Sequence, residues 1–212
     1  GETSIYYRLA PNGNGVVILL IVFTDDFRCA APKKLVIYTL DRLHFLFGFS
    51  DGAIVTLSAK KGAIQWSKRV GEGRYPDIVA TPQSIGPDLY VSGYYKPVIA
   101  MDRASKNVLW RLEHGAAAAS LIEVSEDATV IFHPGRDGKL RRIAGSTGAI
   151  DWTWDSGTNG ALSEPQRTPA GLLVSSSEGA VYLLDSDTGE ERWRFNLSET
   201  TGIDDSTDLY PA

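Results

Sequence analysis

Few residues in this sequence are of a type and at a spacing that could support catalysis. The three histidines, His44, His114 and His133, form no pair at metal-ligand spacing. The single cysteine, Cys29, excludes the multi-cysteine zinc and iron–sulfur patterns, and as a nucleophile it has only the adjacent Arg28 to favour its thiolate. The one Gly-x-Ser-x-Gly match, "GFSDG" at residues 48–52, is followed by the strand-like run "AIVTLS" and not by the helix that a nucleophile elbow needs. No glycine-rich phosphate loop leads into a helix. We therefore expect structural or solvated roles for the histidines and no catalytic residues.

The best candidate for a metal site is the stretch "GIDDSTD", which contains Asp204, Asp205 and Asp208. Calcium takes about six to eight oxygen ligands, and no compact acidic constellation of that size is present. Because the stretch is rich in turn-forming residues, a solvated loop before a strand is favoured. We predict no metal site.

A basic cluster is formed by Arg136, Lys139, Arg141 and Arg142. Alternation along a strand would place Arg141 and Arg142 on opposite faces, so they would not form one patch. The net charge of the chain is −5, which does not favour nucleic acid or an anionic membrane as a partner. We expect a solvated or rim-facing cluster, and no nucleic-acid partner.

The longest apolar run is "GVVILLIVF" at residues 15–23. It is too short to cross a bilayer as a helix, which takes about 20 residues. A signal peptide ending at Cys29 is disfavoured because Asp25, Asp26, Phe27 and Arg28 stand where small neutral residues are needed. The abundance of Val and Ile favours a buried strand. We expect no direct membrane span, and a targeting peptide that is not present in this chain.

An internal repeat organises most of the sequence. Four segments align without a gap on a tryptophan, and these tryptophans are 44, 42 and 41 residues apart: Trp66, Trp110, Trp152 and Trp193. In three segments a glycine stands four residues before the tryptophan and another stands fourteen before it: Gly62, Gly148 and Gly189, then Gly52, Gly138 and Gly179. Lys106 and Lys96 take these places in the second segment. A period of about 42 residues indicates a repeat architecture.

Each repeat reads as four short strands with tight turns. In the last one, "GLLVSS", "AVYLLD" and "RWRFNL" are β-branched or aromatic runs separated by "SEG" and "SDTG". Such meanders bury both faces by packing radially, so we predict an all-β fold, a β-propeller of four-stranded antiparallel blades. The expected blades span about residues 34–70, 75–114, 115–156 and 160–198 of one domain, 1–212. The repeated tryptophan is expected to be a wedge between neighbouring blades.

The tryptophan segments resemble the tryptophan-docking repeat of pyrroloquinoline-quinone-like β-propellers, Ala/Leu-x-Asp-x-x-Thr-Gly-x-x-x-Trp. "LDSDTGEERW" is nearly a consensus copy with Asp185, and "MDRASKNVLW" with Asp102 is more degenerate, as are "IAGSTGAIDW" and "LSAKKGAIQW". The resemblance covers about residues 34–198. The superfamily includes quinoprotein dehydrogenases and BamB-type scaffolds of outer-membrane assembly. Luminal sensor domains of unfolded-protein-response kinases resemble the repeat more distantly.

The resemblance also describes what a dehydrogenase would need. It implies a quinone in the funnel of a complete ring, Ca²⁺ held by Glu and Asn oxygens, an Asp base, and commonly an adjacent cysteine pair. Cys29 is the only cysteine, so that pair is absent. We therefore expect no cofactor.

Partial blade material is expected at both ends of the repeat array. Residues 1–25 read as the last two strands of a blade, with Gly13 aligned to Gly189 and Val17 to Trp193, and residues 203–212 read as the start of a further blade. Such propellers usually have about seven or eight blades. Three arrangements are open: a fragment of a larger propeller, a small five-bladed ring closed by the two ends, or a ring assembled from two chains.

The expected function is a non-catalytic protein-binding scaffold, of the BamB type in outer-membrane protein assembly. Partners would be other proteins, bound through interblade loops or exposed strand edges, with a homodimer as a further arrangement. The expected location is periplasmic or extracytoplasmic, or luminal in a eukaryote. Two alternatives are a luminal or extracellular sensor domain that dimerises and senses unfolded protein, and a fragment of a quinoprotein dehydrogenase.

Overall fold

The computed structural model describes residues 3–9, 16–23, 36–41, 44–48, 52–58, 60–70, 78, 82–93 and 97–197. These residues form eighteen strands, and the all-β class predicted from the sequence is confirmed. Sixteen of the strands make four antiparallel sheets of four strands each, in which neighbours in sequence are neighbours in space. The predicted start of a further blade at 203–212 lies outside the described residues.

Each four-stranded sheet is one blade of the predicted propeller. Blade 1 contains β3 (Val36–Asp41), β4 (His44–Gly48), β5 (Ala53–Ser58) and β6 (Ile64–Arg69). Blade 2 contains β7 (Gln83–Ile85), β8 (Asp88–Ser92), β9 (Val98–Asp102) and β10 (Val108–Leu112). Blade 3 contains β11 (Leu121–Val124), β12 (Thr129–Pro134), β13 (Lys139–Ala144) and β14 (Ile150–Asp155). Blade 4 contains β15 (Gln166–Thr168), β16 (Gly171–Ser175), β17 (Ala180–Leu184) and β18 (Glu191–Asn196).

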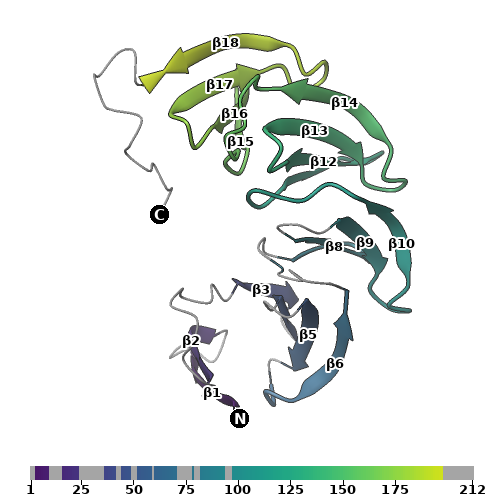
Figure 1. The fold of residues 1–212 in the computed structure, drawn as a ribbon. Coiled ribbons are helices and arrows are strands. Elements are labelled where there is room, and N and C mark those ends of the chain that lie inside the picture. Colours follow the sequence, from purple (N-terminus) through teal and green to yellow (C-terminus); the bar gives the residue numbers. More distant parts are fainter. Residues whose placement is uncertain are drawn as a thin grey trace.

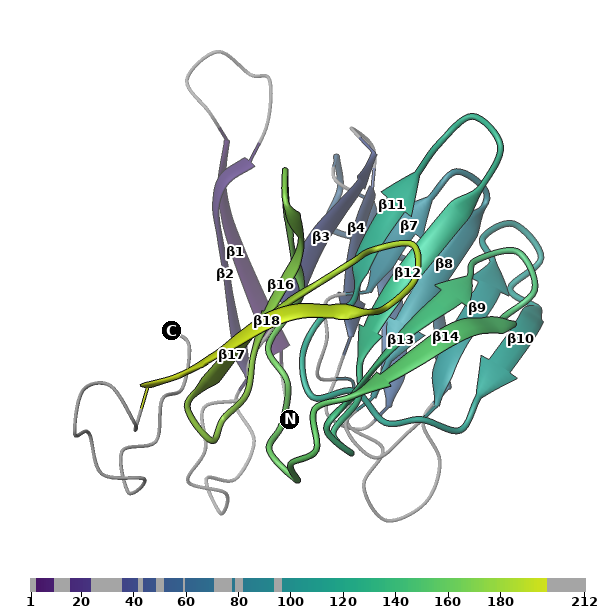
Figure 2. The same cartoon turned by 90° about the horizontal axis from the view of Figure 1, so that it is seen from above.

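The blades follow one another along an arc (Figure 1). The last strand of each blade, β6, β10, β14 or β18, lies on the convex outer side, and the earlier strands lie towards the inside. Viewed from above, the sheets of blades 2 and 3 stack face against face (Figure 2). This arrangement buries the apolar residues that alternate along each strand, which a single sheet could not do by itself.

The core formed by the described residues is divided into three clusters, one for each pair of neighbouring blades. Between blades 1 and 2 it contains Leu46, Ile54, Leu89, Val91, Ile99 and Met101. Between blades 2 and 3 it contains Tyr90, Ala100, Ile131 and Ile143. Between blades 3 and 4 it contains Phe132, Leu140, Trp154, Leu172, Val174, Tyr182 and Leu184. Stability therefore comes mainly from nearest-neighbour interfaces, as in other repeat architectures.

A β-bulge precedes the repeated tryptophan in every blade. In blade 4, Trp193 pairs with Leu183 and Glu191 pairs with Leu184, so Arg192 is the extra residue. The same shift leaves Gln65, Leu109 and Asp151 unpaired in blades 1, 2 and 3. A bulge bends the strand and changes the direction of the next side chain. The recurrence of the bulge gives all four tryptophans the same position on the outer strand.

The N-terminal strands form a separate two-stranded antiparallel sheet, β1 (Thr3–Leu9) with β2 (Val16–Phe23). Their register also shifts once: Arg8 pairs with Ile18 and Leu9 with Val16. By analogy with the blades, Ile18 holds the register position of the tryptophan. The alignment of Val17 with Trp193 is therefore wrong by one residue, because an alignment of sequences without gaps does not show where a bulge lies.

Candidate functional site

Two of the repeated tryptophans contact the β-turn of the next blade. The indole Nε1 of Trp110 donates to the carbonyl oxygen of Gly145 at 2.6 Å, and that of Trp152 donates to the carbonyl oxygen of Ser186 at 3.3 Å. Gly145 and Ser186 each belong to the turn between the third and fourth strands of the following blade. The tryptophan thus joins two blades by both packing and a hydrogen bond.

Glycine in these turns leaves room for the ring. A Cβ atom at Gly148 would lie 2.7 Å from Cδ2 of Trp110, and one at Gly189 would lie 2.7 Å from Cδ2 of Trp152. Both glycines also have a positive φ, of 74° and 73°, which favours glycine over other residues. The turn conformation and the interblade contact therefore impose the same residue type.

Blade 2 departs from this pattern at Lys106. Its φ of 65° keeps the left-handed turn conformation without a glycine. The ammonium nitrogen of Lys106 lies 4.5 Å from the ring centre of Trp66, and Lys68 donates to the Lys106 carbonyl oxygen. A cation–π contact thus stands where a glycine faces the ring in the other interfaces. Sequence reasoning identified the substitution but not this contact.

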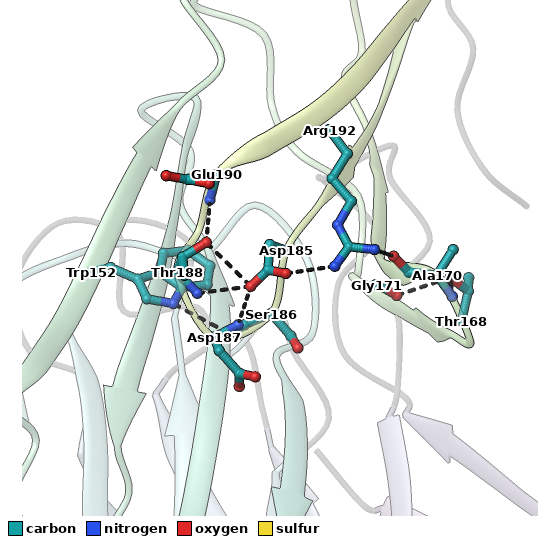
Figure 3. A network of polar contacts seen from close by, with 10 residues as sticks. All are labelled: Trp152, Thr168, Ala170, Gly171, Asp185, Ser186, Asp187, Thr188, Glu190 and Arg192. Carbon is teal, nitrogen blue, oxygen red and sulfur yellow. Dashed lines mark hydrogen bonds and ion pairs between the residues drawn. The ribbon is translucent and has the colours of Figure 1, made fainter.

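The turn of blade 4 is organised by Asp185 (Figure 3). Its Oδ1 accepts from the backbone N–H groups of Asp187 at 2.9 Å and Thr188 at 3.0 Å, and from the Thr188 hydroxyl at 3.2 Å. Its Oδ2 accepts from Arg192 at 2.6 Å, and Arg192 also donates to the carbonyl oxygen of Ala170 at 2.6 Å. The bulge residue therefore ties the turn to the neighbouring hairpin.

Asp102 has the corresponding position in blade 2, and its Oδ1 accepts from the backbone N–H of Ser105 at 2.5 Å. An aspartate that accepts from the backbone two or three residues ahead stabilises a turn locally. The aspartates of the repeat thus act within the protein's own turns, and Ala144 takes this position in blade 3 without such a bond.

We expect Asp185→Asn to lower Tm by about 2–4 °C at neutral pH. The Thr188 N–H, then Arg192, then the Asp187 N–H hold the pKa of Asp185 well below its ordinary range. A lowered folded-state pKa means that this stabilisation is present above the ordinary aspartate range and is lost as the pH falls through the folded-state pKa. The Tm of the asparagine variant should therefore lack the fall at acidic pH that protonation of Asp185 causes in the wild-type chain. Thermal unfolding at neutral and acidic pH measures both effects.

Asp187→Asn is the matched control for Asp185→Asn, because its exposed side chain lies in the same turn. Equal losses of Tm in the two variants would show that the Asp185 network does not stabilise the turn.

An open cleft of about 480 Å³ lies between blades 2 and 3. It is lined by the loop between β11 and β12 and by residues of the two sheets, among them Asp88, Tyr90, Glu126, Asp127, Arg142 and Asp151. Arg142 forms an ion pair with Asp151. Burial, and then Asp88, raises the pKa of Tyr90 to about 12, so its hydroxyl stays protonated. Loops and interblade clefts of this kind are where propellers vary without loss of the fold.

Comparison with known proteins places this geometry in a family. A family model described as outer membrane protein assembly factor BamB matches residues 36–153. This span is more than half of the chain. The chain belongs to the BamB family.

Individual BamB relatives are distant and longer than this chain. Outer membrane protein assembly factor BamB of Legionella pneumophila is 24% identical over 160 residues, which are 72% of this chain and 41% of that protein. The crystal structure of BamB from Moraxella catarrhalis superposes with a TM-score of 0.67 at 22% identity, covering 90% of this chain and 57% of the other. The chain thus spans about two fifths of the length of its curated BamB relatives, and the structural likeness establishes the β-propeller fold.

One relative outside the BamB family was also found. Quinohemoprotein alcohol dehydrogenase ADH-IIG of Pseudomonas putida is 25% identical over 152 residues, which are 62% of this chain and 21% of the enzyme. The repeat is therefore shared by two functional classes, as the resemblance implied.

Within this BamB-type fold the predicted basic cluster is divided between two faces. Arg141 donates to both carboxylate oxygens of Asp137, at 3.0 and 2.5 Å, and its side chain is buried. Arg142, on the opposite face of β13, pairs with Asp151 instead. The prediction of a solvated or rim-facing role is wrong for Arg141, because the turn carboxylate of Asp137 offsets the cost of burying its charge.

Of the other residues considered for chemistry, His114 and His133 lie close enough to interact electrostatically. His133 is buried in β12, and its Nδ1 lies 3.1 Å from the hydroxyl of Ser120, whereas His114 lies in the loop after β10. Cys29 and the aspartates at 204, 205 and 208 lie outside the described residues. Among the described residues, no group of three or more His, Cys, Asp or Glu side chains could hold a metal ion. No helix of that part is long and apolar enough to cross a membrane.

The last tryptophan of the repeat has a different environment. Trp193 is 45% exposed and Phe195 is 43% exposed on the outer strand of blade 4. Trp154, which has the repeat position of Phe195 in blade 3, is 8% exposed because blade 4 covers it. The repeated tryptophan is thus an interblade contact wherever a following blade is described.

Proposed function

We propose that this chain is part of a non-catalytic, protein-binding scaffold that acts in outer-membrane protein assembly on the periplasmic side of that membrane. The observation that carries the proposal is the BamB family match over residues 36–153, which spans blades 1 to 3 and the interblade contacts of Trp66 and Trp110. In a fold of this kind the blades form a rigid frame, and the connecting loops are free to vary and to recognise partners.

The residues support binding through loops and not through a catalytic centre. The carboxylate of Asp185 in the blade 4 turn is used in internal hydrogen bonds, and Arg141 and Arg142 are used in internal ion pairs. By contrast, the loop from Ser125 to Ala128 is exposed and borders the cleft between blades 2 and 3. We therefore place partner recognition at loops of this type.

Photo-cross-linking in an envelope extract tests both the partner and the surface. A photoreactive phenylalanine analogue would replace Val124, which is exposed beside the β11–β12 loop, or Leu109, the exposed bulge residue of the convex side. The extract would come from Legionella pneumophila, whose BamB serves as the positive control. Mass spectrometry then identifies any cross-linked protein.

We expect adducts with outer-membrane assembly proteins from the Val124 position and none from the Leu109 position. Adducts from neither position, while the Legionella control gives them, would contradict the scaffold function. Adducts from Leu109 alone would support assembly partners but contradict recognition by loops.

The dehydrogenase relative supplies the competing function. Pyrroloquinoline quinone with Ca²⁺ should leave the absorbance spectrum of the quinone and the Tm of the protein unchanged. A rise in Tm of several degrees that depends on both additives would favour a dehydrogenase fragment.

A further inference from the structure

The interface between blades 2 and 3 contains a buried polar pair where the other blades have apolar residues. His133 pairs across the sheet with Arg141, and the corresponding pairs are Val91 with Ile99 in blade 2 and Val174 with Tyr182 in blade 4. Val91 and Ile99 pack in the core between blades 1 and 2, and Val174 and Tyr182 in the core between blades 3 and 4. Only the interface of blades 2 and 3 has this polar substitution among the described blades.

The hydrogen bonds of His133 suit its neutral form. The residue is 0% exposed, its Nδ1 lies 3.1 Å from Ser120 Oγ, and its Nε2 has no hydrogen-bond partner. Ser120 also joins the two blades, because its carbonyl oxygen accepts from the Gln83 side chain of β7 at 2.6 Å. A proton added to Nε2 would have no well-aligned acceptor in this interface.

The charges that face His133 come from three segments. Arg141 on β13 and His114 in the loop after β10 oppose a positive charge on the ring. The carbonyl oxygens of His114 and Gly115 partly favour that charge, although neither makes a well-aligned bond with Nε2. Asp137, in the β12–β13 turn, is the nearby carboxylate, and it already accepts both bonds from Arg141. Among the residues that the structure describes, the interface therefore provides no unused counter-charge for a protonated His133.

The loop after β10 fastens the two blades together beside this ring. The Ala116 N–H donates to the carbonyl oxygen of Gly93 at 3.0 Å, and the Ala117 N–H donates to that of Pro134 at 2.9 Å. A change in the charge of His133 would thus act next to the backbone bonds that hold blade 2 against blade 3.

We propose that the interface of blades 2 and 3 is an acid-responsive joint, in which protonation of buried His133 beside Arg141 separates the two blades before the apolar interface of blades 3 and 4 opens. The proposal does not rest on the scaffold function. It makes the cleft and loops between blades 2 and 3 the part of the chain that responds to pH.

Burial, and then Arg141, lowers the pKa of His133 to about 4, against 6.5 for an ordinary histidine. Because the folded-state pKa is lowered, the opened form takes up the proton more readily. The contribution of neutral His133 to the stability of the closed interface is complete above about pH 6.5, and it is lost as the pH falls towards about 4. Between about pH 7.5 and about pH 5 the opening equilibrium constant should rise roughly 30-fold.

Hydrogen exchange measured by mass spectrometry, corrected for intrinsic exchange rates, tests the proposal at these two pH values. Amides of β8, β9, β12 and β13 should lose protection roughly 30-fold at the lower pH, whereas those of β16 and β17 should not. His133→Val introduces the residue that blades 2 and 4 have at this position and should abolish the difference. His114→Gln removes the other imidazole of this interface, whose pKa burial also lowers, and should retain most of the difference.

Equal loss of protection in both interfaces, or an unchanged acid response in His133→Val, would overturn the proposal. If the valine variant does not fold, the His133 imidazole can be titrated by NMR in the wild-type chain. A ring that remains neutral in the folded form down to about pH 5 supports the joint, and titration near the ordinary histidine value contradicts it.

Discussion

Replacing Gly189 by alanine is expected to destabilise the chain by about 3 kcal/mol. The positive φ of this residue costs an alanine roughly 1 kcal/mol. The new Cβ would also lie 2.7 Å from Trp152, so the ring must shift, and such overpacking costs about 1–3 kcal/mol. The two penalties add because one concerns the turn backbone and the other concerns the interface of blades 3 and 4.

Gly179→Ala separates these two contributions. Gly179 also has a positive φ, of 85°, but no atom lies within 4 Å of the Cβ position. We expect a loss of about 1 kcal/mol, which is the backbone cost alone. Urea unfolding of both variants gives the comparison, and equal losses would mean that the contact with Trp152 does not require glycine.

Trp154→Ala is expected to cost about 3–5 kcal/mol. The ring is buried in the interface of blades 3 and 4, where it makes an edge contact with Tyr182 at 4.8 Å between ring centres. Such an aromatic pair contributes about 0.5–1.5 kcal/mol beyond its buried area. The indole Nε1 also donates to Glu191 at 3.3 Å. Truncation therefore removes packing, a ring pair and a hydrogen bond between two blades.

Phe195→Ala is the control at the same repeat position. Because Phe195 is 43% exposed, its truncation should cost about 1 kcal/mol. Denaturant unfolding followed by circular dichroism measures both variants. A cost for Phe195→Ala equal to that of Trp154→Ala would show that the outer face of blade 4 is covered in solution.

Several features were predictable because they are local. The four-stranded meander follows from short β-branched runs separated by turn residues, as in "AVYLLD", "SDTG" and "RWRFNL". The spacing of Gly148 from Trp152, repeated as Gly189 from Trp193, indicated one blade after another. Stacking in an arc then follows from the need of each sheet to cover its apolar faces. The β-propeller and its family could therefore be recognised from the residues.

Other features depend on which atoms a neighbouring blade presents. The bulge before each tryptophan, the contact of Lys106 with Trp66, and the burial of Arg141 have no signature within one repeat. Nothing in the sequence distinguishes His133 from an exposed histidine near the end of a strand, whereas the structure shows that it is fully buried.

The sequence by itself thus determined the blade, its turns and the order of the blades, because backbone preferences and alternation act over a few residues. Only the tertiary structure decided which tryptophan is covered and which polar groups are enclosed between blades. The physical reason is that burial, hydrogen-bond partners and pKa shifts are properties of an interface, and each interface here joins residues about forty positions apart in the chain.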